Sequence, residues 1–152
     1  MVYCDFSNSL YKYLDIYHNG LKKLANKEVQ AIVGHLREMS DENQDEILTQ
    51  FLSDYCDSDV WDTLKDRGNA DIPYELKEYI LMWITPRCEE KKMPECRWYY
   101  ELFRNHKQGY QAAVKYLEIA YSSMKCDQKT IDLLFDSYFR LGGTSFSRWM
   151  HN

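Results

Sequence analysis

Apolar residues recur at intervals of three and four along almost the whole chain, which is the spacing of helices that bury one face. The period-two alternation that marks half-buried strands is nearly absent. The pattern therefore predicts an all-α protein: a compact bundle of about seven or eight helices, with solenoid-like helix pairs toward the C-terminus.

Three helices are expected in the first part of the chain. Hydroxyl and acidic side chains ahead of an apolar run favour helix starts, whereas glycine favours helix ends. The expected boundaries are a cap at Ser7 or Ser9 and a stop at Gly20, a second helix from about Leu21 or Lys27 to Met39, and a third capped by Ser40. The second helix is expected to bury Leu24, Val29, Ile32, Val33 and Leu36.

Prolines and glycines divide the rest of the chain. Proline is tolerated in the first turn of a helix but disrupts a helix interior. The expected landmarks are a short helix from Asp57 or Ser58 to Gly68, a helix opened by Pro73 and kinked or ended by Pro86, a helix after Pro94, a turn at Gly109, and a last long helix capped by Asp127 and ended by Gly142 and Gly143.

The helices after Pro94 carry a spacing of their own. Tyr110, Ala113, Leu117 and Ala120 resemble the second helix of a tetratricopeptide repeat, in which small residues let two helices approach closely. The next first helix would start at Gln128, with packing positions at Ile131, Leu134, Tyr138, Leu141 and Gly142. The earlier unit departs from the family pattern at Arg97, Tyr100, Glu101 and Arg104. Any antiparallel helix pair needs similar spacing, so ordinary helix packing remains the alternative.

Length and composition predict a single globular domain over residues 1–152. The chain has 152 residues, of which 45% are hydrophobic and 15% aromatic, enough to bury a sizeable core. We interpret residues 1–90 as an acidic helical part and residues 91–152 as a repeat-like helical part. No apolar run reaches the roughly 20 residues of a membrane span, and the first residues do not resemble a signal peptide, so we expect a cytoplasmic protein without membrane contact.

Charge is distributed unevenly along the chain. The net charge is −5, but residues 1–76 hold 7 basic and 15 acidic side chains, a net −8, whereas residues 77–152 hold 12 basic and 9 acidic, a net +3. Nine carboxylates and no Lys or Arg occur between Glu38 and Asp62. A solvated helix face is the ordinary explanation of such a run. The alternative is a docking surface, because unpaired like charges repel one another but accelerate association with a basic partner.

The acidic run supplies the candidate partner-binding residues. Carboxylates would make the electrostatic contacts, and nearby aromatic side chains would act as anchors. The candidates are Glu42, Asp45, Glu46, Asp54, Asp57, Asp59 and Asp62, with Tyr55 and Trp61 as the aromatic anchors. Core packing is the competing explanation for both aromatic residues.

The sequence contains none of the common catalytic or cofactor-binding signatures. There is no P-loop, no G-x-G-x-x-G, no H-E-x-x-H and no G-x-S-x-G. The five cysteines are widely spaced and lack C-x2-C pairs, so we expect reduced, largely buried thiols and no zinc site. The expectation is a protein that is not an enzyme and has no cofactor. Direct nucleic-acid binding is disfavoured, because Lys and Arg are not clustered and the pI is near 5.4.

A small, acidic, all-helical chain with a dense carboxylate run resembles the immunity proteins of bacterial toxin systems. That resemblance implies a cytoplasmic protein that neutralises a basic toxin domain, such as a nuclease, by direct contact. A DNA-mimic role is a variant of the same hypothesis. The alternative is a helical-repeat adaptor that holds a peptide or protein against its C-terminal helices through Tyr99, Arg104, Tyr116 and Tyr138.

Overall fold

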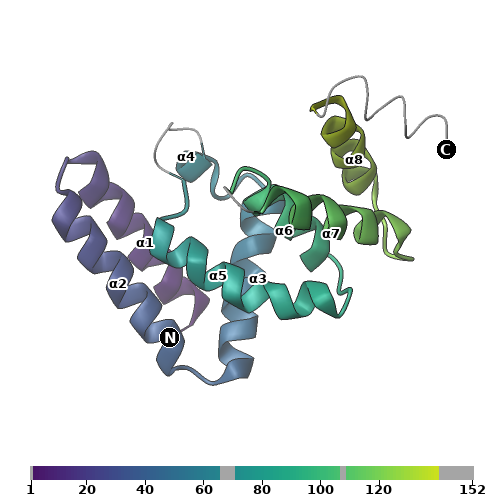
Figure 1. The fold of residues 1–152 in the computed structure, drawn as a ribbon. Helices are drawn as coiled ribbons and strands as arrows, with labels where there is room; N and C mark the ends of the chain where they lie inside the picture. The colour runs from purple at the N-terminus through teal and green to yellow at the C-terminus, as the bar shows by residue number, and fades with distance from the viewer. Residues whose placement is uncertain (1, 66–70, 107–108, 141–152) are drawn as a thin grey trace. The chain divides into compact units, whose positions relative to one another are not determined.

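The computed structural model describes residues 2–65, 71–106 and 109–140. Within these ranges all regular secondary structure is helical, which confirms the all-α prediction. The eight helices are α1 (Tyr3–His18), α2 (Lys22–Glu38), α3 (Asp41–Asp57), α4 (Asp62–Lys65), α5 (Tyr74–Glu89), α6 (Glu95–Phe103), α7 (Tyr110–Ser122) and α8 (Gln128–Arg140) (Figure 1).

The chain divides into two compact units, Met1–Met82 and Trp83–Asn152. The division falls inside α5, whereas the change of character along the sequence lies after residue 90. The first unit therefore includes the whole acidic run from Glu38 to Asp62, and the second includes the repeat-like helices.

In the first unit, α1 packs against α2 and α3. Its core is built from large apolar side chains that are fully buried, among them Phe6, Leu10, Phe51 and Trp61. The rings of Phe6 and Phe51 meet edge to face with centroids 5.2 Å apart, and Phe51 meets Trp61 in the same way at 5.6 Å. Edge-to-face contact is a favoured aromatic geometry, so this cluster fixes α1 on α3 and on the segment that follows it.

The first helix begins earlier than the sequence predicted. It starts at Tyr3, and Ser7 and Ser9 lie inside it rather than at its cap. The apolar stripe extends one turn further because Phe6 is fully buried, and burial of that ring outweighs the capping preference of a serine. The stop at Gly20 is confirmed, since this residue takes a φ of +79°, a conformation that favours glycine.

The boundaries of α2 and α3 follow local chemistry closely. The Ser40 hydroxyl accepts a hydrogen bond from the Asn43 N–H at 3.3 Å, which confirms the predicted cap of α3. The inward face of α2 is predicted correctly except at Leu24, whose side chain is exposed. Leu24 lies in the first turn of α2, and the helices that cover Val29 and Leu36 do not cover it there.

Two expectations around the prolines need correction. α5 continues through Pro86 to Glu89, so Pro86 does not end the helix, and a kink at Pro86 stays a prediction. A proline removes one intrahelical hydrogen bond, and because Pro86 and Met82, one turn before it, are exposed, water can replace the missing donor. The short helix is also shorter than expected: it begins at Asp62 rather than at Asp57 or Ser58. The stops expected at Gly68, Gly142 and Gly143 lie outside the described residues.

In the second unit, α7 packs against both α6 and α8. Ala113, Leu117 and Ala120 are fully buried along α7, as expected for a helix whose small residues permit close approach. Asp127 caps α8 as predicted, because its Oδ1 accepts hydrogen bonds from the Thr130 N–H at 2.9 Å and the Thr130 hydroxyl at 2.6 Å. Helix pairing explains these features without a true repeat, so membership of the repeat family stays a prediction.

The cap of α8 makes stability of the second unit depend on pH. Burial raises the pKa of Asp127, but hydrogen bonds from Thr130 and the charge of Arg97 outweigh it, so the pKa lies below the ordinary 3.8. A lowered pKa means that Asp127 stabilises the fold above about pH 4 and loses this contribution as the pH falls through the folded-state pKa. Asp127→Asn keeps a good cap but has no charge to titrate. The free energy of unfolding of the natural protein should exceed that of Asp127→Asn at pH 7, and this difference should shrink below pH 4; a constant difference in urea titrations would contradict the assignment.

Candidate protein-binding surface

Helix α3 presents a line of carboxylates along one side. At 100° per residue, Glu42, Glu46 and Asp57 lie within a narrow arc of the helix surface, with Thr49 and Ser53 between them. All three carboxylates are exposed, whereas Ile47, Leu48, Phe51 and Leu52 on the opposite side are buried. From Glu42 to Asp57 the line extends about 22 Å at 1.5 Å per residue.

Two more exposed carboxylates follow the end of the helix. Asp59 lies in the turn after α3 and Asp62 begins α4, and both are exposed. We call these five residues, Glu42, Glu46, Asp57, Asp59 and Asp62, the acidic stripe. Among the described residues, no salt bridge involves Glu42, Glu46, Asp59 or Asp62. Their charges therefore face solvent.

The stripe is unfavourable for the helix that carries it. Acidic residues in the first turn of α3, such as Glu42, are stabilised by the positive end of the helix dipole. At the other end the dipole is negative, and the last turn of α3 contains no basic residue. Asp57 closes the helix there and Asp59 follows within two residues, so the helix dipole does not stabilise these two charges. Helix stability thus explains the start of the stripe but not its far end.

Asp54 has a structural role instead of the predicted exposed one. Its Oδ2 accepts a hydrogen bond from the Tyr3 hydroxyl at 2.7 Å, and its Oδ1 accepts one from Gln50 Nε2 at 3.1 Å. The Tyr3 oxygen in turn accepts a hydrogen bond from Trp61 Nε1 at 3.2 Å. A chain of hydrogen bonds therefore joins α1, α3 and the segment before α4, and we remove Asp54 from the candidate contacts.

The hydrogen-bond chain through Tyr3 predicts a measurable loss of stability when the Tyr3 hydroxyl oxygen is removed. Tyr3→Phe leaves the indole N–H of fully buried Trp61 without its acceptor, and an unsatisfied buried donor costs about 1–3 kcal/mol. The free energy of unfolding, measured by guanidinium titration, should fall by that amount. Tyr11→Phe, which removes a hydroxyl from an exposed tyrosine of the same helix, should change it by less than about 0.5 kcal/mol. Equal effects of the two variants would contradict the proposed role of the hydrogen-bond chain.

Neither predicted aromatic anchor stands free on the surface. Trp61 is 0% exposed and packs against Phe51 and Tyr11, so the partner-contact prediction for Trp61 is wrong in this fold. Tyr55 is half-buried, donates its hydroxyl hydrogen to Asp71 Oδ1 and carries the Lys65 ammonium over its ring at 4.7 Å. The competing explanation, core packing, accounts for both side chains.

The remaining carboxylates of the run lie off the stripe. Asp45 is half-buried, and Asp41 is on the side of α3 that faces Tyr79 of α5. Burial raises the pKa of the Tyr79 phenol, Arg37 lowers it and the charge of Asp41 raises it. The Tyr79 hydroxyl donates to Gln44 Oε1 at 2.7 Å. Asp41 thus belongs to the contact between α3 and α5.

Two of the four residues of the alternative peptide-binding hypothesis are in the core of the second unit. Tyr99 and Tyr116 are buried, with ring centroids 4.7 Å apart. Burial raises the pKa of the Tyr116 phenol, and so does its hydrogen bond to Glu89. Arg104 is half-buried with its guanidinium over the Tyr100 ring at 5.6 Å, and Tyr138 is half-buried beside Glu118. Tyr99 and Tyr116 therefore have a packing role and are not available to a peptide.

Two features of the described residues were not found from the sequence. Arg97 is 4% exposed and forms a buried ion pair, although arginine is rarely buried. The signal was its position four residues before Glu101, an ion-pair spacing on a helix. Gly34 lies in the middle of α2 beside a groove. An isolated glycine inside a helical pattern was the available signal.

Comparison with known proteins does not identify a family for this chain. No family model matches the chain, and neither the curated proteins nor the solved structures contain a significant match. Across the described ranges, no group of three His, Cys, Asp or Glu side chains is placed to hold a metal ion. In the same part of the chain, no helix has the length and apolar character needed to cross a bilayer.

Proposed function

We propose that this chain is a protein-binding protein that recognises a cationic protein domain through its acidic stripe. The supporting observation is that four exposed carboxylates, Glu42, Glu46, Asp59 and Asp62, have no salt bridge among the described residues. Like charges at this spacing repel one another, and a basic surface relieves that repulsion on binding. The chain itself then has no catalytic role.

A toxin domain of the nuclease kind is the partner that best fits this chemistry. A nuclease must be cationic where it holds phosphates, so a carboxylate line that docks there both attracts the enzyme and blocks its substrate site. This is the role implied by the resemblance to bacterial immunity proteins. It predicts fast association that slows steeply as salt rises, because exposed charges are screened within about 10 Å at 0.1 M.

The test begins with paired capture from the native host. The natural protein and a variant with its four unpaired carboxylates reversed to lysine serve as matched baits, and the partner is the protein that only the natural bait retains. The captured protein is then purified, and its association rate is measured by stopped flow at several salt concentrations. A steep fall in rate with salt supports the proposal. A salt-independent rate, or equal capture by both baits, contradicts it.

A second candidate function is a helical adaptor that binds an apolar peptide. It is favoured by a small apolar pocket of about 100 Å³ in the second unit, lined by Tyr121, Ile131, Leu134, Phe135 and Tyr138. Ile131→Asp would place a charge in this pocket and abolish peptide capture under the adaptor hypothesis. The same variant leaves binding to a basic domain unchanged under the first proposal.

A further inference from the structure

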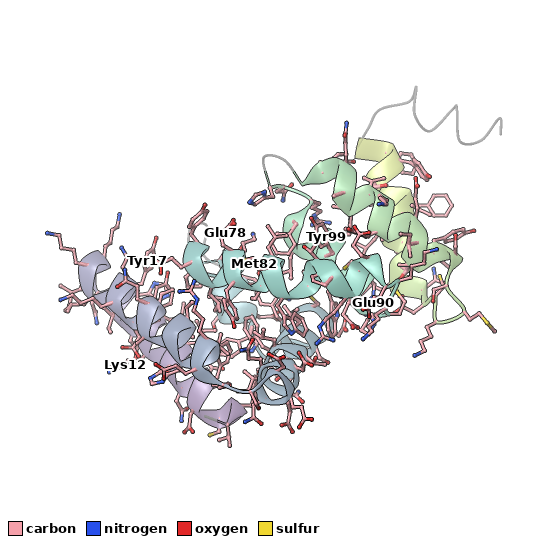
Figure 2. All side chains as sticks on the ribbon, turned by 60° about the horizontal axis from the view of Figure 1, so that its bottom comes forward. Lys12, Tyr17, Glu78, Met82, Glu90 and Tyr99 are labelled. Atoms are coloured by element: carbon pink, nitrogen blue, oxygen red, sulfur yellow. The ribbon has the colours of Figure 1, made fainter. Side chains whose placement is uncertain are left out.

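A second surface of the first unit has the properties of a binding groove. A groove of about 320 Å³ runs between α2 and α5. On the α2 side it is lined by Val33, Gly34 and Arg37, and on the α5 side by Tyr74, Glu78 and Met82. Figure 2 shows Glu78 and Met82 one turn apart along α5.

Gly34 has no role within the described fold that requires glycine. It lies in the interior of α2, where glycine is among the least favourable residues for a helix. A Cβ added at Gly34 would meet no atom within 4 Å, and Gly34 is not among the positive-φ residues of the structure. Neither crowding nor backbone conformation explains this glycine. A close approach from outside the chain does, because only a residue without a side chain leaves the floor of the groove open.

Apolar side chains frame the groove on its α5 side. Tyr74 and Met82 are each 75% exposed, so both leave apolar surface in contact with water. Residues at i, i+4 and i+8 share one side of a helix, so Tyr74, Glu78 and Met82 form a row along α5 beside Gly34. An apolar group seated over Gly34 would remove both exposed side chains from water.

The charge of the groove selects the chemistry of its occupant. Exposed Glu75 lines it, and Arg37, a cation of the same lining, already lies over the Tyr79 ring at 5.9 Å. Glu38, the residue after Arg37, is exposed and begins the acidic run. Residues 1–76 together carry a net charge of −8. A second copy that docked through the same face would bring the same negative charge and be repelled, whereas a basic segment is attracted.

We propose that the α2–α5 groove binds a segment of the cationic partner in which apolar side chains are flanked by Lys or Arg. An apolar side chain of that segment sits on Gly34 between Tyr74 and Met82, and its basic neighbours meet Glu75. This inference rests on the proposed function, since it assigns the same partner a second, apolar point of contact. The acidic stripe then governs the rate of encounter, and the groove governs how long the complex lasts.

The probe for the test is a synthetic peptide of leucine and lysine at helical spacing, with a leucine–glutamate peptide of the same length as its control. Binding is measured by fluorescence anisotropy. Gly34→Leu fills the floor of the groove and should weaken binding of the basic peptide at least tenfold. The matched control is Ala31→Leu, which adds the same side chain at an exposed position of α2 outside the groove lining and should leave binding unchanged.

Stability measurements keep the test independent of folding. Gly34→Ala should raise the midpoint of thermal unfolding by about 4 °C, because alanine favours the helix and the space is open. A lower midpoint would show that the fold itself needs this glycine and would overturn the proposal. So would tight binding of the glutamate peptide, or equal binding by Gly34→Leu and the natural protein.

The proposals for the groove and for the acidic stripe can be tested separately. If reversal of the stripe abolishes binding of the captured partner while Gly34→Leu has no effect on that complex, the proposed function stands and the groove proposal is wrong. If Gly34→Leu leaves the lifetime of the complex unchanged but abolishes self-association in sedimentation, the occupant is a second copy and the proposal is overturned. If both baits capture the same proteins, the proposed function is wrong, and the peptide measurement alone decides the groove: weaker binding of the basic peptide by Gly34→Leu still supports it.

Discussion

Reversal of Glu42, Glu46, Asp59 and Asp62 to lysine is expected to weaken binding of the cationic partner at least about 100-fold. Steering by exposed charges changes association rates by about 10–10³-fold, and reversal replaces attraction with repulsion at four positions. The loss should appear mainly in the association rate, with a smaller change in dissociation. Surface plasmon resonance at low and physiological salt separates the two rates.

The structure also decides which carboxylates belong in that variant. Asp54 is left unchanged because it accepts the hydrogen bond from Tyr3, and its reversal would disturb the packing of α1 on α3. The four substituted side chains are exposed, so far-ultraviolet circular dichroism should match that of the natural protein. A matched control reverses four carboxylates away from the stripe: Asp5, Asp15, Glu90 and Asp132, all exposed. Equal loss of binding in this control would show that net charge, not the stripe, attracts the partner.

Arg97→Ala is expected to lower the free energy of unfolding of the second unit by about 3 kcal/mol. Arg97 Nη1 lies 2.8 Å from Glu101 Oε2, and Arg97 Nε lies 3.3 Å from Asp127 Oδ2. Removal of one partner from a buried ion pair leaves the other charges poorly compensated and opens a cavity. Lys129 Nζ, 2.8 Å from Glu101 Oε1, still neutralises part of that charge, so the expected loss is at the low end of the usual range.

Hydrogen exchange of the amides of α6 and α7 measures this loss where it occurs. Lys115→Ala removes the same charge from an exposed position of α7 and should change the free energy of unfolding by less than about 0.5 kcal/mol. The double variant Arg97→Met and Glu101→Leu removes both buried charges and keeps most of the volume, so it should recover much of the lost stability. A loss below about 1 kcal/mol in Arg97→Ala would show that the ion pair contributes little.

Local chemistry along the chain was sufficient to predict much of the fold. Helical periodicity predicted the all-α class, because residues three and four apart share a helix face whatever the helix packs against. The Ser40 and Asp127 caps were also predictable, because a cap joins a side chain to an N–H only three residues away. The stop at Gly20 depends on one backbone angle and is equally local.

The candidate surface was predictable only in part, because exposure depends on residues far along the chain. Asp54 and Asp57 look alike in the sequence, yet Asp54 is drawn into the fold by Tyr3, which is 51 residues away. The sequence leaves two roles open for Trp61, an anchor or a core residue, and the structure shows its indole N–H donating to Tyr3, 58 residues away. The carboxylate run therefore indicated an acidic surface, but only tertiary contacts decided which of its members face solvent.

By itself, the sequence determined the helices, the Ser40 and Asp127 caps and the concentration of negative charge before Lys65, since these depend on neighbours within a turn or two. The tertiary structure decided that Leu24 is exposed, that Arg97 is buried with its counter-ions, and that Gly34 lies open beside α5. The physical reason is that burial is set by which helix faces meet. Contacts of that kind join residues whose separation along the chain leaves no local pattern.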